Sequence, residues 1–190
     1  MRKVLYFLIC MAFCINYACK KEKVANETFD EYGYFGATTA DLNGLPWTAK
    51  TIVSKASKFD VCTEDSCLAI IADHYINNNI NRGRIVMGFL SYKTGKAIFN
   101  KANPWLSKVK NSINYYSRGE DGDVLTGSYS IIKKDENNFI NISKIDRVTG
   151  DFEATFEATM VRDSAWLPKN TVPDTIKIKN GKIRGRYWQK

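Results

Sequence analysis

The chain has 190 residues, and 13% of them are aromatic. Its formal net charge is +8, and two of the positive charges, Arg2 and Lys3, lie in the first eighteen residues, which carry no acid. The length beyond residue 32 suffices for one well-buried core, so a second domain is not required. A moderately basic balance favours anionic partners, and the export signal described next argues against nucleic acid as one of them.

Residues 1–18 have the layout of a bacterial lipoprotein signal peptide. Arg2 and Lys3 precede an uncharged apolar run from Val4 to Ile15, and Ala18 stands directly before Cys19. In such signals the chain is cut before the cysteine, whose thiol then carries a diacylglycerol. We therefore predict lipidation of Cys19 and location in the cell envelope as an outer membrane lipoprotein, facing either the periplasm or the surface.

Two alternatives for the first segment stay open. Asn16 and Tyr17 stand where a lipoprotein signal usually has aliphatic or small residues, so a plain secretory signal cut after Ala18 would leave a soluble periplasmic protein with an unmodified Cys19. A retained membrane span is the other alternative. A helix from Val4 to Ala18 would rise only about 22 Å, whereas the hydrocarbon core is about 30 Å thick.

Residues 19–32 form a polar stretch without apolar periodicity, which is typical of a flexible tether. Fully extended, the dozen residues after Cys19 would reach about 40 Å. The tether leads into one domain that we assign to residues 33–190.

From Gly33 onward, short runs rich in Val, Ile, Phe, Tyr and Thr alternate with turn signals, which is typical of antiparallel strands. The alternation is clearest in Asp151–Val161, where apolar residues occupy every second position. Only Asn103–Lys110 could form a short helix. The expected strands are Tyr34–Leu42, Trp47–Ser54, Cys67–His74, Arg84–Tyr92, Ala97–Asn100, Ser112–Ser117, Val124–Lys133, Phe139–Asp146, Asp151–Val161, Thr175–Lys179 and Lys182–Tyr187.

These elements predict an all-β fold, an antiparallel β-sandwich or barrel-like single domain with at most one short helix. Asn-Gly pairs at 43–44 and 180–181 are strong hairpin signals, and Thr149-Gly150 and Thr94-Gly95 supply further turns.

Cys62 and Cys67 are the two cysteines within the expected domain, and in an oxidising compartment we expect them to form a disulfide. So short a ring would stabilise the fold by about 2 kcal/mol. A zinc site formed by the two cysteines with Asp73 and His74 is the sharper alternative, but the spacing matches no standard zinc motif. We predict no metal and no cofactor.

Signatures of catalysis are scarce. The chain lacks a Gly-x-Ser-x-Gly elbow, a phosphate-binding glycine loop and a His-Glu-x-x-His motif, and His74 is its only histidine. Glu120, Asp121 and Asp123 indicate a solvated turn, with a calcium site as the less favoured interpretation. We therefore assign no catalytic residue, although two acids brought together by the fold would be invisible in the sequence.

Two groups of residues are candidates for binding. Trp105, Tyr115 and Tyr116 are expected in loops or at strand ends, where flat rings can stack on sugars, although packing explains most such residues. If Asn180-Gly181 forms a type I′ turn, five cations share one face of the last hairpin. They would either discourage edge-to-edge pairing of a terminal strand or bind a polyanion such as lipopolysaccharide phosphate, and they are Lys177, Lys179, Lys182, Arg184 and Arg186.

Two motifs carry a family resemblance. The segment from Ala40 to Ala49 resembles the opening A-x-x-N-G-x-x-W-x-A of uncharacterised Bacteroidetes lipoproteins. The segments Gly150–Phe156 and Ile178–Ile183 are similar to their closing G-x-F-x-x-x-F and I-x-x-G-x-F, with Ile183 in place of the usual Phe. The resemblance implies a lipid-anchored β domain of unknown function, with no catalytic residues to transfer.

Two hypotheses of function follow. The first is a lipid-anchored envelope lipoprotein with a non-catalytic binding or structural role, whose partner is a glycan, an anionic polymer such as lipopolysaccharide, or a protein. The alternative is an exported hydrolase, such as a glycosidase, whose carboxylates meet only in three dimensions.

Overall fold

The computed structural model describes residues 35–55, 67–76, 80–101, 110–163 and 172–188. These residues form ten strands and no helix. The candidate helix Asn103–Lys110 lies almost entirely outside the described residues. The strands are β1 (Gly36–Leu42), β2 (Leu45–Lys55), β3 (Cys67–Ile76), β4 (Ile80–Ser91), β5 (Gly95–Ile98), β6 (Ser112–Arg118), β7 (Leu125–Ser130), β8 (Phe139–Ile145), β9 (Asp151–Arg162) and β10 (Thr175–Trp188).

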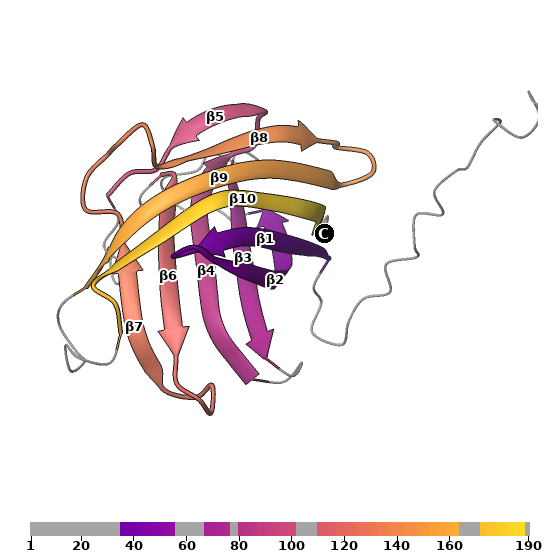
Figure 1. Ribbon diagram of the computed structural model, residues 1–190. Helices are drawn as coiled ribbons and strands as arrows, with labels where there is room; N and C mark the ends of the chain where they lie inside the picture. Colours follow the sequence, from indigo (N-terminus) through magenta and orange to yellow (C-terminus); the bar gives the residue numbers. More distant parts are fainter. Residues whose placement is uncertain (1–34, 56–66, 77–79, 102–109, 164–171, 189–190) are drawn as a thin grey trace, which may run out of the picture.

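Eight of the strands close into an antiparallel barrel, which confirms the predicted all-β, barrel-like domain. Around the barrel, β1 pairs with β2, and β3, β4, β6, β7, β9 and β10 follow until β10 meets β1. Figure 1 shows β1, β9 and β10 crossing steeply in front of β3, β4, β6 and β7. The two remaining strands, β8 and β5, extend the front layer beyond β9.

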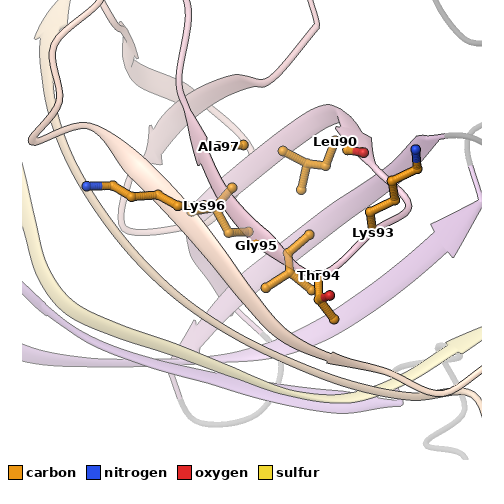
Figure 2. Close-up of a pocket in the computed structure, with 9 residues that line it drawn as sticks. Leu90, Lys93, Thr94, Gly95, Lys96 and Ala97 are labelled. Atoms are coloured by element: carbon orange, nitrogen blue, oxygen red, sulfur yellow. The ribbon is translucent and has the colours of Figure 1, made fainter.

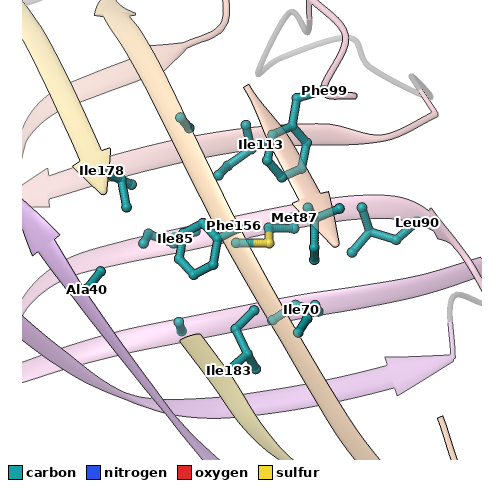
Figure 3. Packing of buried hydrophobic residues seen from close by; sticks show 14 of the residues in the cluster. Ala40, Ile70, Ile85, Met87, Leu90, Phe99, Ile113, Phe156, Ile178 and Ile183 are labelled. Atoms are coloured by element: carbon teal, nitrogen blue, oxygen red, sulfur yellow. The ribbon is translucent and has the colours of Figure 1, made fainter. Parts of the chain in front are cut away.

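Alternating side chains fill the barrel. In β9 the predicted alternation is confirmed, because the apolar positions from Phe152 to Met160 are at most 3% exposed. Figure 3 shows the ring of Phe156 among Met87, Ile85 and Ile178 from other strands. A barrel of eight strands is just wide enough for side chains to occupy its interior, and burial of these apolar side chains stabilises the fold.

The two Asn-Gly pairs have different structures. Asn43-Gly44 forms the predicted two-residue hairpin, since Leu42 pairs with Leu45 and both turn residues have positive φ. The predicted hairpin at Asn180-Gly181 is wrong, because β10 continues through these residues as one strand. A β-bulge lies there instead, with Asn180 at φ 54°.

Close packing explains why a glycine follows the bulge. A Cβ built on Gly181 would lie 2.5 Å from Cε1 of Phe156 and 2.6 Å from its carbonyl oxygen. The glycine therefore allows β10 to approach β9 closely, which is a common reason for glycine inside a strand.

Candidate anion-binding site

The five predicted cations of the last strand lie on one exposed face, and we call them the basic strip: Lys177, Lys179, Lys182, Arg184 and Arg186. Their shared face results from the bulge rather than from a hairpin. Side chains of a regular strand alternate, so odd-numbered Lys177 and Lys179 would face away from even-numbered Lys182 and Arg184. The extra residue at Asn180 reverses the alternation and brings both sets to the outside, while Ile178 and Ile183 remain in the core.

The strand that carries the basic strip is not an edge strand. β10 pairs with β9 from Thr175 to Arg186 and with β1 from Ile178 to Gly185. Lysines on an exposed edge discourage pairing with another chain, but a strand hydrogen-bonded on both sides needs no such protection. The interpretation of these cations as edge protection therefore does not apply here.

Carboxylates neutralise part of the strip. Lys179 is ion-paired with Glu157, and Arg186 lies 3.2 Å from Asp151, which also accepts a hydrogen bond from Lys144 at 2.9 Å. The hydrogen bond from Lys144 holds the pKa of Asp151 below its usual value, and the same bond raises the pKa of Lys144. Sequence reasoning missed these acids as partners, since only the strand pairing brings them beside β10.

Three members of the strip make no ion pair with the residues that the structure describes: Lys177, Lys182 and Arg184. In the strand register, Lys182 lies between the exposed Thr155 of β9 and Thr39 of β1, and Lys177 lies beside Thr159. Arg184 lies across from Glu153 without an ion pair. Lys177 and Lys182 thus lie beside uncharged threonines on the outer face of the barrel.

Two members of the predicted aromatic group, Tyr115 and Tyr116, do not share one surface. Tyr115 is 6% exposed and points into the barrel, 5.8 Å from the ring of Tyr129, whereas its neighbour Tyr116 lies on the outer face. Burial raises the pKa of Tyr115 to about 12. Burial also raises the pKa of Tyr116, with a further contribution from the negative charge of Asp163. Trp105 lies outside the described residues. Because neighbouring strand residues face opposite sides, Tyr115 and Tyr116 cannot contact one sugar together.

The cysteine and metal predictions have separate outcomes. Cys67 is buried at the start of β3, and Cys62 lies outside the described residues, so their disulfide stays a prediction. Asp73 and His74 face opposite sides of β3, with Asp73 bound to Arg84 and Nδ1 of His74 2.6 Å from the carbonyl oxygen of Thr48. They therefore do not converge on a metal ion. Within the described ranges, no three His, Cys, Asp or Glu side chains are grouped to hold one.

The acidic turn between β6 and β7 is built as a solvated turn. Gly122 has φ +79°, and Oδ1 of Asp121 accepts a hydrogen bond from the backbone N–H of Asp123 at 3.1 Å. Arg118 donates a hydrogen bond to the carbonyl oxygen of Gly122 at 3.0 Å, which fixes the turn on the barrel.

A pocket of about 190 Å³ lies between the end of β4 and the β5–β8 pair (Figure 2). Its apolar wall includes Leu90 and Ile142, and the turn after β4 contributes Lys93. Figure 2 shows the side chains of Lys93 and Lys96 extending in different directions, and the ammonium of Lys96 lies 4.4 Å from the ring centroid of Phe139. The two lysines do not converge on a common ligand position, so we assign no ligand to this pocket.

In the part of the chain that the structure describes, no helix is long and apolar enough to cross a bilayer. No protein-family model, curated protein or solved structure matches this sequence.

Proposed function

We propose that this chain is a lipid-anchored lipoprotein of the bacterial cell envelope, similar to the uncharacterised Bacteroidetes lipoproteins, whose barrel binds an anionic partner through the basic strip without catalysing a reaction. Its signal-like residues 1–18 and Cys19 support the anchor. One observation supports the binding role most directly. The strip lies on a strand paired on both sides, so the cations are not needed to protect an edge.

The hydrolase alternative gains no comparable support. The carboxylate of Asp73 is held by Arg84, and that of Asp163 accepts hydrogen bonds from Ser128 and Ser130 at 3.1 and 2.9 Å. Both acids thus have structural partners in the barrel wall, and we do not propose a hydrolytic reaction.

Retention on an immobilised anionic polysaccharide tests the binding role. Replacing Lys177, Lys182 and Arg184 together by Gln should lower the salt concentration at which the protein elutes, since charge–charge attraction is screened by salt. The matched control replaces Lys110, Lys133 and Lys134 by Gln, which removes the same charge from exposed positions outside the strip. Equal elution shifts for the two triple variants would contradict the proposal.

The anchor has its own test. The intact mass of protein purified from membranes should correspond to a chain that begins at Cys19 and carries acyl groups. An uncut chain or an unmodified Cys19 would contradict the anchor, whatever the basic strip binds.

A further inference from the structure

The chain joins the barrel immediately beside the basic strip. The carbonyl oxygen of Phe35 accepts a hydrogen bond from the backbone N–H of Arg186 at 3.1 Å, and Gly36 pairs with Gly185. A Cβ built on Gly36 would lie 2.5 Å from the carbonyl oxygen of Arg184. Any segment that leads from Cys19 to the barrel therefore ends next to the arginines of the strip.

The basic strip is long enough to contact several anionic groups at once. Outward side chains of a strand repeat about every 6.6 Å, so the strip from Lys177 to Arg186 extends about 30 Å. The residues between Cys19 and Phe35 could reach about 50 Å when extended. An anchor at Cys19 would therefore allow the whole strip to reach the membrane that holds it.

We propose that the basic strip binds the anionic lipid headgroups of the membrane in which Cys19 is anchored, so that the outer face of β10 lies against the bilayer surface. The inference rests on the proposed function, because it requires the acylated cysteine. Basic residues close to a lipid anchor are attracted to anionic headgroups, and a lipid chain combined with a basic patch binds a membrane more firmly than either alone. The exposed threonines beside Lys177 and Lys182 place no carboxylate between these ammonium groups and the headgroups.

Chemical labelling of the full lipoprotein in vesicles tests this orientation. The purified protein is inserted into vesicles of phosphatidylcholine, with or without phosphatidylglycerol, and treated with an amine-reactive reagent that does not cross membranes. Mass spectrometry then measures modification of Lys177 and Lys182 against Lys133 and Lys134, which are exposed outside the strip. With phosphatidylglycerol present at low salt, we expect modification of the two strip lysines to fall severalfold, and to recover at high salt.

Three outcomes would overturn the inference. Equal modification of strip and control lysines on phosphatidylglycerol vesicles would show that the strip does not face the lipid. If a soluble anionic polysaccharide protects the strip and phosphatidylglycerol does not, the partner is a polymer, and the anion-binding role stands while the lipid inference fails. If the mass of the purified chain shows no acyl group on Cys19, the proposed anchor fails together with the inference.

A variant adds an independent readout. Replacing Lys177, Lys182 and Arg184 by Gln should abolish the salt-sensitive protection of the remaining Lys179, whereas the triple change at Lys110, Lys133 and Lys134 should leave it intact. Protection of Lys179 that survives the strip substitutions would also contradict headgroup binding by the strip.

Discussion

Asp73 shows how the barrel holds a charged side chain in its wall. The carboxylate is 1% exposed and accepts hydrogen bonds from Nε and Nη2 of Arg84 at 2.6 and 3.0 Å. Asn81 donates a third hydrogen bond to Asp73 at 2.7 Å. Arg84 is 36% exposed and keeps contact with water, whereas the buried carboxylate of Asp73 depends on protein groups to balance its negative charge.

This asymmetry predicts an order of stabilities. Replacing Arg84 by Met should lower the free energy of unfolding by about 3 kcal/mol, because the buried Asp73 loses the positive charge and the two hydrogen bonds that Arg84 supplies. Replacing Asp73 by Ala should lower it by about 1 to 2 kcal/mol, since Arg84 can turn towards water. Urea unfolding of both variants measures the two values. A larger loss for Asp73→Ala than for Arg84→Met would contradict this account.

Tyr115 makes the free energy of unfolding depend on pH in the alkaline range. Burial raises its pKa to about 12 in the folded chain, whereas an unfolded tyrosine titrates near 10. Because the folded state disfavours the ionised phenol, the contribution of Tyr115 is complete below pH 10 and is lost as the pH rises to about 12. Replacing Tyr115 by Phe should flatten the fall of unfolding free energy over this range. Denaturant unfolding at several alkaline pH values checks it, and an unchanged slope would refute it.

Among the strands and turns, the two Asn-Gly pairs show what local sequence can and cannot predict. The asparagine adopts the left-handed conformation in both, with φ of 51° at Asn43 and 54° at Asn180. The local backbone of the asparagine was therefore predictable. Whether the chain then reverses or continues depends on its neighbours, and β10 continues because β1 and β9 pair with it on both sides. Of these two partners, β1 lies far away in the sequence.

The bulge predicts the effect of a deletion. Removing Asn180 takes out the extra residue, so regular alternation then keeps Lys182 outside and Ile183 in the core. We expect this variant to keep a cooperative unfolding transition, as followed by circular dichroism. The matched control deletes Arg184 from the regular part of the strand, which would turn Arg186 inward and the buried Tyr187 outward, and this variant should lose the transition. Equal loss of cooperativity in the two deletion variants would contradict the role of the bulge.

The barrel is closed unevenly. β9 and β10 are paired along most of their length, whereas among the described residues β7 and β9 share only the pairs Tyr129–Arg162 and Ser130–Val161. Asp163 strengthens this seam, since its carboxylate accepts hydrogen bonds from two serines of β7 and its N–H donates to the carbonyl oxygen of Ser128 at 2.8 Å. The hydroxyl of Tyr129 adds a bond to the carbonyl oxygen of Pro173 at 2.9 Å.

Local opening should therefore begin at the β7–β9 seam. Replacing Asp163 by Ala removes two side-chain hydrogen bonds, each contributing about 1 kcal/mol. Amide hydrogen exchange in β7 should accelerate by roughly ten-fold or more, with little change in β3 and β4. Asp146→Ala, which removes an acceptor in the turn between β8 and β9, should affect exchange only near that turn. Uniform acceleration across the barrel in Asp163→Ala would argue against a weak seam.

The class of fold was predictable because apolar and polar residues alternate along a strand, as they do from Phe152 to Met160. The closure of the barrel was not, since the pairing of β9 with β7 and of β10 with β1 joins segments that share no local signal. The candidate site was partly predictable. Its five cations were evident in the sequence, but the acids beside them and the internal position of their strand follow from long-range pairing.

The pairing of β1 with β10 also bears on when the protein can fold. Figure 1 shows the described C-terminal end beside the beginning of β1. Both β1 and β9 lack one of their pairing strands until β10 is in place. A nascent chain therefore has two open strand edges until residues 175–188 have left the ribosome. Such late completion would suit a polypeptide that must thread through a translocation channel before it acquires its final shape.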